Sequence, residues 1–417
     1  MKTYIFIIRR ICNISGAQQY VYNKMNYLES QGWRVLIFSS MHGPILINSF
    51  EKYQGNIIPA LYFSPSVFRK GLVESTIDRI VGEIGDCNRN DCIIESDALP
   101  RAIWGELIAS RLNCRHLAFF MQEWHHYDDE MKNFLRFKYE RHELAGITRD
   151  SIHQMFRDEK VEGRDDTLFI PFCNNVFDDC EDKFSKLLDR TANCTLGSVG
   201  RLNKPCVPAI VEGFCSYAKK HPEMRINIVM IGGSKERGKY EYVRKQMKAC
   251  DNVNLVLTGD MYPIPLAFAE KIDVFVSTAG AATATYSAGF PTVKVNPITG
   301  EAIGIMGLDN IEGKSMYRRS SDLTIPESID KTFKETDKIE YKANLGKEYK
   351  DRMYTEFERQ VSFTSIIEGE EYYDKSLLLR LRTPNHDRTR VHLIHCILGH
   401  VFGANILELI RKAMGKI

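Results

Sequence analysis

The sequence lacks the features that would assign it at once to a membrane-spanning, secreted or nucleic-acid-binding class. It has no uninterrupted apolar run of about 18 residues, so no membrane-spanning helix is predicted. Its 11 cysteines include no CxxC pair and are scattered, which favours reduced thiols in a cytosolic protein over a metal or disulfide framework. Its 56 basic and 54 acidic residues nearly cancel, so no nucleic-acid partner is predicted.

Several signatures of catalytic and cofactor sites are also missing. The chain contains no GxGxxG fingerprint, which disfavours a dinucleotide cofactor, and no HExxH pattern for zinc. It contains no GxSxG nucleophile elbow and no strict Asp-x-Asp pair for a metal-held nucleotide. We therefore expect neither a metal ion nor a cofactor.

The chain does contain a repeated α/β rhythm. Short Val- and Ile-rich runs that end in glycine or small polar residues alternate with amphipathic segments, which is the pattern of parallel βαβ units. The first run, Thr3–Ile8, is too short for a signal peptide, and we predict a buried strand there. We expect two parallel-sheet α/β domains over 1–180 and 190–330, with a charged linker near 177–192. A helical tail, 331–417, is expected to pack back across the domain junction.

Cations and glycines follow two of the predicted strands in the second half. Arg201 and Lys204 come directly after a strand, where an Arg fork and a Lys point charge can neutralise a diphosphate. Gly232 and Gly233 end the next strand and allow a ligand or the next helix to approach the backbone closely. Each pair has a plain alternative, because the cations could be solvated and the glycines could form an ordinary tight turn.

A small-residue loop from Ser277 to Thr283, with Gly280 in its middle, follows a third predicted strand. It leads into a helix predicted over Ala282–Ala288, whose free backbone N–H groups would attract an anion. Ser277, Thr278 and Thr283 would add hydroxyl donors. We favour phosphate binding, and a capped helix packed closely on the sheet is the alternative.

Loops in the first half present candidate groups for the acceptor side of a site. Ser15 and Gly16 lie between the first strand and its helix, near the expected sugar or acceptor, unless Ser15 only caps the helix. Gln122, Glu123 and His125 follow another predicted strand. Glu123 or His125 could act as the base for a hydroxyl acceptor, or both could be solvated.

The segment from Val391 to Ile410 is predicted to be a strongly apolar helix. One interpretation is peripheral contact with a membrane interface. The interpretation that we prefer is a helix packed across the domain junction. The basic residues that flank it are Arg388, Arg390, Arg411, Lys412 and Lys416.

Five segments carry motifs whose order and spacing are characteristic. They are Ser15-Gly16-Ala17, Ile170–Val176, Val199–Leu202, Ile228–Gly233 with Asn252–Gly259, and Ala288–Val293. Together they resemble the GT-B glycosyltransferases, in particular glycosyltransferase family 4 of bacterial surface-polysaccharide synthesis. The resemblance covers roughly residues 1–305.

This resemblance implies the GT-B fold, in which two Rossmann-like domains face a cleft and the second holds most of a nucleotide-diphosphate-sugar donor. It implies that Arg201 contacts the donor diphosphate and that Gly16 approaches the donor or acceptor from the first domain. The design requires stabilisation of the departing diphosphate and of an oxocarbenium-like sugar, and no metal ion.

The chain departs from the family pattern at three places. Where the family has a phosphate-clamping lysine, this chain has Cys206, and Lys204 is the nearest substitute. Ala, Thr and Ser replace the family's paired glutamates, and Glu301 is the stand-in that we consider. The family's cleft histidine has no clear match, so the three polar residues after the first-domain strand compete for its place.

The leading hypothesis is a cytoplasmic, metal-independent hexosyl- or related glycosyltransferase; the interfacial interpretation of the tail would place it at the inner face of the membrane. It would move a sugar from a nucleotide-diphosphate-sugar to a hydroxyl of a surface-glycan or lipid-linked acceptor. One alternative is a non-catalytic GT-B module that acts as a partner or scaffold, as the missing glutamates suggest. Another is a nucleotide-sugar epimerase, which uses the same fold.

Overall fold

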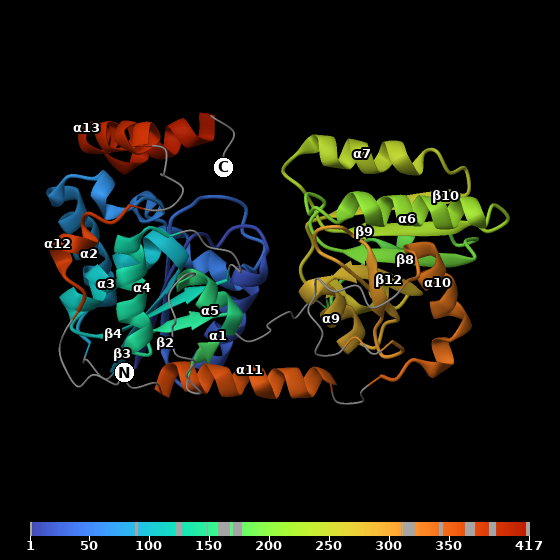
Figure 1. Cartoon of the computed structure of the whole chain (residues 1–417), viewed down its shortest axis with the longest axis horizontal. Coiled ribbons are helices and arrows are strands. Elements are labelled where there is room, and N and C mark those ends of the chain that lie inside the picture. The colour runs from blue at the N-terminus through green and yellow to red at the C-terminus, as the bar shows by residue number, and fades with distance from the viewer. Residues whose placement is uncertain are drawn as a thin grey trace. The chain divides into compact units, whose positions relative to one another are not determined.

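The computed structural model forms two units of packing (Figure 1). Unit 1 comprises Met1–Cys173 and Asp351–Ile417, and unit 2 comprises Asn174–Lys350. The chain therefore leaves the first unit once and returns to it after the second. The domain limits proposed from the sequence stay a prediction. The structure describes residues 2–87, 91–121, 127–147, 149–156, 167–169, 177–309, 311, 322–341, 345–362, 372–382 and 389–413.

Unit 1 is built on a six-stranded sheet with the order β2-β1-β3-β4-β5-β6, in which neighbouring strands are parallel. Every residue of β1 is buried, as expected for an inner strand of a sheet that is covered on both faces. The strand predicted at Thr3–Ile8 is confirmed. The strands are β1 (Thr3–Ile8), β2 (Arg34–Ser39), β3 (Cys92–Asp97), β4 (Arg115–Phe120), β5 (Leu144–Gly146) and β6 (Leu168–Phe169).

Helices cover this sheet. Helix α4 begins where the Asp128 carboxylate accepts a hydrogen bond from the Met131 N–H, which satisfies a free donor of the first turn. The α-helices are α1 (Gly16–Ser30), α2 (Lys70–Ile84), α3 (Ala98–Leu112), α4 (Asp129–Glu140), α5 (Arg149–Phe156), α12 (Lys375–Leu378) and α13 (Thr389–Ala413), together with α11 (Leu345–Ser362), which begins in unit 2 and ends in unit 1. The 3-10 segments are η1 (Asn48–Asn56), η2 (Pro59–Tyr62) and η3 (Pro65–Val67).

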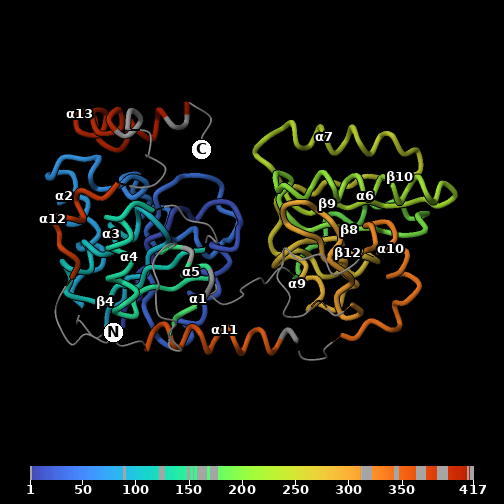
Figure 2. The backbone as a smooth tube through the Cα atoms, viewed as in Figure 1, coloured from blue at the N-terminus to red at the C-terminus, as the bar shows by residue number. Residues whose placement is uncertain are grey.

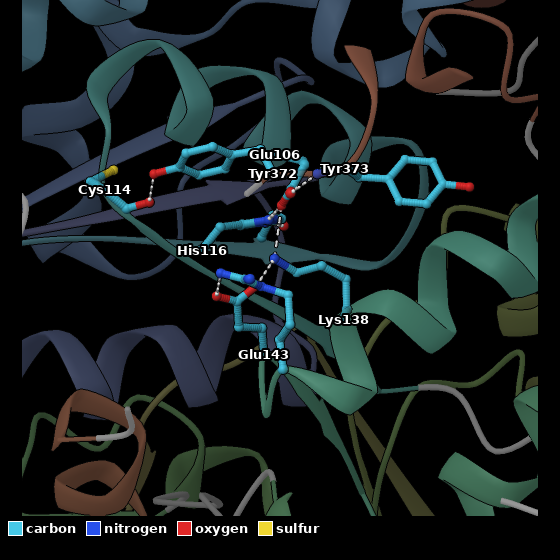
Figure 3. Close-up of polar contacts among 9 residues, drawn as sticks. Glu106, Cys114, His116, Lys138, Glu143, Tyr372 and Tyr373 are labelled. Atoms are coloured by element: carbon cyan, nitrogen blue, oxygen red, sulfur yellow. Dashed lines mark hydrogen bonds and ion pairs between the residues drawn. The ribbon is translucent and has the colours of Figure 1, made fainter. Parts of the chain in front are cut away.

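A buried network of charges ties the returning C-terminal segment to unit 1 (Figure 3). Glu106 Oε2 lies 2.7 Å from His116 Nδ1 and 2.8 Å from Lys138 Nζ, and all three side chains are buried. Glu106 Oε1 accepts a hydrogen bond of 3.0 Å from the Tyr373 N–H. Because a buried carboxylate is stable only when its lone pairs are satisfied, the segment 372–382 completes the interior of unit 1.

The last turns of α11 join a second buried network in unit 1. Gln360 Oε1 accepts hydrogen bonds from Lys24 Nζ (2.5 Å) and the Tyr20 hydroxyl (2.8 Å). Lys24 also forms a buried ion pair with Glu95 on β3. Gln360 Nε2 donates to the Phe169 carbonyl, so α11 links α1 to the last strand of the sheet.

Unit 2 contains a second six-stranded sheet, with the order β10-β9-β8-β12-β13-β14. All its strand pairs are parallel except β13 with β14. Its buried Val and Ile runs fit a sheet covered on both faces. The strands are β8 (Cys194–Val199), β9 (Ile226–Ile231), β10 (Val253–Gly259), β12 (Val274–Thr278), β13 (Thr292–Val295) and β14 (Ala302–Ile305).

The segment predicted as a linker already packs with unit 2. Strand β7 (Phe177–Asp178) pairs with β11 (Ile264–Pro265), and the Phe177 ring contacts the Phe290 ring at 5.3 Å. A short 3-10 turn, η5 (Ser185–Leu187), follows. The helices of unit 2 are α6 (Val207–Lys220), α7 (Arg237–Met247), α8 (Leu266–Ala269), α9 (Ala279–Ser287) and α10 (Ile325–Lys334), with the 3-10 turn η6 (Thr336–Lys338).

Candidate functional site

The strand order of unit 2 reverses between β8 and β12. From β8 the chain winds outward through β9 to β10, and it then returns to the other side of β8 to build β12, β13 and β14. In open parallel sheets, ligands bind outside the carboxyl ends of the strands at such a switch point. The residues that follow β8 and β12 are therefore the first place to look for a site.

Two cations follow β8. Arg201 is exposed and Lys204 is half-buried. The Lys204 ammonium packs against Gly200, because a Cβ added to that glycine would lie 3.3 Å from Lys204 Nζ. Burial lowers the pKa of Lys204; Cys206 opposes this shift and the charge of Arg201 adds to it. Neither cation forms an ion pair within the part of the chain that the structure describes. Both are therefore available to an anionic ligand.

Space for a ligand borders Lys204. A cavity of 390 Å³ lies between the loop after β8 and the starts of α6 and α7. Cys206, at the position where the resembled family has a lysine, is buried, and burial raises the pKa of its thiol. A neutral buried thiol is a poor partner for a phosphate, so phosphate binding by Lys204 stays a prediction. The lining residues are Leu202, Lys204, Val207, Pro208, Glu236, Gly238, Lys239 and Tyr242.

The Gly232-Gly233 turn after β9 is locked against the loop after β8. Gly232 has a φ of 140°, and an added Cβ would lie 2.2 Å from the Gly200 carbonyl oxygen. The Gly233 N–H donates to Asp260 Oδ1 at 2.9 Å, and its carbonyl accepts from the Leu202 N–H at 3.0 Å. The two glycines thus allow close packing of two loops, and the Gly233 amide is already paired within the fold.

The small-residue loop predicted from Ser277 to Thr283 is not a loop. Strand β12 runs to Thr278 and α9 begins at Ala279, because Ala279 takes a φ of 48° and turns the chain within one residue. That left-handed conformation costs an L-residue about 1–2 kcal/mol. Strained backbone of this kind is concentrated at functional sites.

The hydroxyls at this junction have different environments. Ser277 is buried, and its Oγ accepts a hydrogen bond from the Val199 N–H at 3.1 Å, so it links β12 to β8. Thr283 Oγ1 donates weakly to the Ala279 carbonyl at 3.4 Å. Thr278 is only 2% exposed, and its Oγ1 has no hydrogen-bond partner among the described residues. A buried unpaired hydroxyl costs about 1–3 kcal/mol, so a ligand that bonds to it would recover that energy.

The start of α9 is suited to an anion. Gly280 lies in its first turn, which contains no acidic side chain. The first N–H groups of a helix lack intrahelical partners and carry the positive end of the helix dipole. The free N–H groups of α9, the Thr278 hydroxyl and the two cations after β8 therefore meet at one switch point.

Glu301 lies in the turn between β13 and β14, at the same edge of the sheet. It is exposed, and its Oε2 accepts a hydrogen bond of 3.2 Å from the Thr299 hydroxyl. Next to it, an added Cβ on Gly300 would lie 2.4 Å from Ala209 Cβ, so the turn packs on the start of α6. Glu301 is thus placed beside the loop after β8, and its catalytic role stays a prediction.

The candidates in unit 1 are described only in part. Ser15 precedes α1, and its hydroxyl donates to Gln18 Oε1 at 2.5 Å rather than to the helix backbone. Gly16 is exposed, and the atom nearest to an added Cβ, Met121 Cε, would be 3.8 Å away. Gln122, Glu123 and His125 lie outside the described residues, so their predicted roles stay predictions.

The structure adds polar groups that sequence reasoning missed. In unit 1 the strand order reverses between β1 and β3, where Asp97 accepts a hydrogen bond of 3.0 Å from the Arg9 N–H. The buried Arg101 pairs with Asp97 at 2.6 Å. In unit 2, Asp260 fixes the glycine turn. The available signal was an acidic residue directly after, or at the end of, a predicted strand.

Comparison with solved structures identifies the fold. A glycosyltransferase from Rickettsia africae ESF-5 superposes with a TM-score of 0.54 and 12% identity, over 94% of this chain and 98% of that one. HepE of Anabaena, solved with UDP and glucose, gives 0.52 and 13%, over 87% and 98%. The pneumococcal O-GlcNAc transferase GtfA, solved with UDP and GlcNAc, gives 0.51 and 10%, over 86% and 98%. No protein-family model matches the chain, and no curated protein matches its sequence. The chain has the GT-B fold, with two Rossmann-like parallel-sheet units and a C-terminal helix.

Proposed function

We propose that this chain is a glycosyltransferase that takes its sugar from a nucleotide-diphosphate donor bound by unit 2. The observation that carries the proposal is the buried Thr278 hydroxyl at the start of α9, beside the two cations at the switch point; among the described residues, none of these three groups has a hydrogen-bond or ion-pair partner. Of the three solved structures named above, one is described as a glycosyltransferase and one as an O-GlcNAc transferase, and HepE was solved with UDP and glucose. These descriptions support the same assignment.

The proposed chemistry requires stabilisation of a leaving diphosphate. Arg201 would grip it as a planar donor fork, and Lys204 would add a compact charge from the half-buried side. The N–H groups of α9 and the Thr278 hydroxyl would bond the remaining oxygens. Positive charge and fixed dipoles at this position lower the energy of the transition state, in which the diphosphate develops negative charge.

The finer features of the assignment are also proposals. We infer a metal-independent hexosyl- or related transferase of glycosyltransferase family 4. We propose a surface-glycan or lipid-linked acceptor and a cytoplasmic location. The motif order along residues 1–305 supports these features, and Glu123, His125 and Glu301 are the proposed catalytic groups.

Calorimetry with UDP, GDP and ADP tests the donor site. One nucleotide should bind, and Arg201→Ala should weaken that binding about 10- to 100-fold, the range for a lost charged hydrogen bond. Arg225→Ala is the matched control, because Arg225 precedes β9 at the opposite edge of the same sheet. Absence of binding to every nucleotide, or equal loss in both variants, would refute the site.

A non-catalytic GT-B module is the second candidate, and specific contacts favour it. The Ser277 hydroxyl and the Gly233 amide are already paired within the fold, and the first turn of α9 has no glutamate. Slow hydrolysis of the bound donor by the wild type, absent in Arg201→Ala, would exclude this candidate. Conversion of the donor to an isomer, without release of nucleotide, would indicate an epimerase instead.

A further inference from the structure

The outer side of helix α13 exposes large apolar side chains. Leu393, Ile394, Ile397, Val401 and Phe402 are each between 53% and 60% exposed, and we call these five residues the α13 face. They occupy positions i, i+1, i+4, i+8 and i+9, which lie along one side of a helix. A contiguous exposed apolar surface of this kind marks an interaction site more often than an ordinary surface.

The opposite side of α13 is already used. Ala404 and Leu407 are buried, and Gly399 packs so closely on η3 that an added Cβ would lie 2.6 Å from the Val67 carbonyl oxygen. Figure 2 shows the red helix beside the blue segment that contains η2 and η3, which it contacts. The helix is therefore held on unit 1 by one side and leaves the α13 face uncovered by described residues.

Charge is distributed around the α13 face in a definite way. Between Val391 and Ile410 the only residue with a formal charge at neutral pH is Glu408, which is buried. The exposed Arg69 and Lys70 follow η3, the segment that carries the helix. Further basic residues precede and follow the apolar stretch: Arg388, Arg390, Arg411, Lys412 and Lys416. In the sequence, an uncharged apolar stretch is thus flanked by basic residues on both sides.

We propose that the α13 face docks unit 1 onto an anionic phospholipid surface, with the helix lying in the plane of the headgroups. An apolar stripe that enters the acyl boundary and basic residues that meet anionic headgroups are the two attractions that hold an interfacial helix. The proposal does not rest on the proposed transferase activity. It would place unit 1 at the surface where a lipid-linked acceptor resides.

An in-plane position fits α13 better than a transmembrane one. By length and composition, the window Leu393–Ile410 is the one stretch among the described helices that could span a bilayer, although 22% of it is buried. Gly403 interrupts the helix with a φ of 75° and a ψ of −169°. A break in the backbone ladder would expose unpaired polar groups to hydrocarbon. Residues on the inner side would also have to detach from unit 1.

A lipid surface also fits better than a second copy of the chain. Basic residues flank the apolar stretch on both sides in the sequence, so two copies would bring like charges together in either the parallel or the antiparallel orientation. An anionic surface is complementary to both ends at once. Self-association is therefore an outcome for the test to exclude.

Vesicle flotation of the full chain, without nucleotide, tests the apolar part. The protein should float with vesicles of phosphatidylcholine and phosphatidylglycerol, and Ile397→Glu with Val401→Glu should reduce binding about tenfold or more. Leu187→Glu, at a residue of unit 2 that is 49% exposed, is the matched control and should float as the wild type does. Unchanged flotation of the double variant would overturn the proposal.

A second flotation experiment tests the contribution of the basic residues. Arg69→Gln with Lys70→Gln should lower binding to the anionic vesicles by about fivefold for each charge removed. Binding to phosphatidylcholine alone should be weak in every variant. Equal flotation of the wild type with neutral and anionic vesicles would overturn the anionic assignment.

Two further measurements separate the remaining outcomes. In sedimentation without lipid, we expect the wild type to be monomeric. A dimer that Ile397→Glu with Val401→Glu dissociates, in a protein that does not float with vesicles, would instead assign the α13 face to a second copy of the chain. Circular dichroism should show an unchanged fold in the double variant, since both positions are exposed. Nucleotide binding should also be unchanged in it, so failure of the donor site and failure of lipid docking are distinguishable.

Discussion

The hydroxyl of Thr278 has two properties that together destabilise the protein when no ligand is bound. It is buried, and it has no hydrogen-bond partner among the described residues. If its role were structural, its retention would only lower stability. If it bonds a ligand, the same hydroxyl lowers stability in the free state and raises affinity in the bound state.

Thr278→Val separates these roles because valine has nearly the same shape and no hydroxyl. We expect unit 2 to be unchanged or more stable, since an unpaired buried hydroxyl costs about 1–3 kcal/mol. We expect nucleotide affinity to fall about tenfold or more, because the hydroxyl would bond a charged phosphate. Thermal unfolding and calorimetry measure the two effects. A destabilised variant with unchanged affinity would contradict the assignment.

His116 makes unit 1 sensitive to acid. Burial lowers its pKa from the ordinary 6.5, and Lys138 adds to the shift, while the Glu106 carboxylate opposes it. His116 therefore binds a proton more readily in the unfolded chain than in the folded chain. The stability of unit 1 should fall as the pH decreases through about 6.5.

His116→Gln should flatten this pH dependence between about pH 7 and pH 5. The three tryptophans, Trp33, Trp104 and Trp124, all belong to unit 1, so their fluorescence reports its unfolding by denaturant. His42→Gln, at an exposed position, is the control. If the free energy of unfolding changes with pH equally in the wild type and in His116→Gln, this histidine does not cause the acid sensitivity.

At the scale of elements, the two turns after β8 and β9 form one interlocked structure. Gly232 fits only because it has no side chain, since its φ is positive and the Gly200 carbonyl lies where a Cβ would be. The hydrogen bond from the Leu202 N–H to the Gly233 carbonyl fixes the loop that carries Lys204. Glycine is therefore required here for packing, whether or not its backbone also touches a ligand.

Gly232→Ala should lower the stability of unit 2 by more than about 2 kcal/mol, because the new Cβ meets backbone that cannot move without breaking the turn. Gly238→Ala is the matched control: nothing lies within 4 Å of its added Cβ, so the change should be neutral or slightly stabilising. Far-ultraviolet circular dichroism during heating measures both. A neutral Gly232→Ala would show that the turns are not locked.

At the scale of the whole molecule, the chain crosses between units twice and finishes in the first. Segment 372–382 supplies the Tyr373 N–H to Glu106, and Leu381 is buried in the core of unit 1. The Leu381 carbonyl accepts a hydrogen bond from the Ser64 hydroxyl at 2.5 Å. Unit 1 is thus complete only after the chain has passed through unit 2.

Leu381→Ala should therefore destabilise unit 1 by about 2–5 kcal/mol, the cost of a core cavity. Tryptophan fluorescence should show this loss, since every tryptophan lies in unit 1. Nucleotide binding, which we assign to unit 2, should be unchanged below the melting point. Leu377→Ala, at a 45% exposed neighbour, is the control. Loss of nucleotide binding in Leu381→Ala would show that the two units are coupled.

The sequence by itself determined the repeating layout and the edge at which to look for a site. Short Val- and Ile-rich strands that alternate with helices must pair in parallel and bury both faces, and Thr3–Ile8 does so. The turns after these strands then meet at one edge, which is why Arg201 and Lys204 could be placed there. These features depend on local periodicity, which is written along the chain.

Only the tertiary structure decided which groups at that edge are free. Ser277 and Thr278 are adjacent hydroxyls, yet one bonds to a neighbouring strand and the other has no partner among the described residues. The Asp260 carboxylate, 27 residues away in sequence, accepts the hydrogen bond of the Gly233 N–H, and the C-terminal segment returns to complete unit 1. Such pairings depend on contacts between residues far apart in sequence, which no local pattern records.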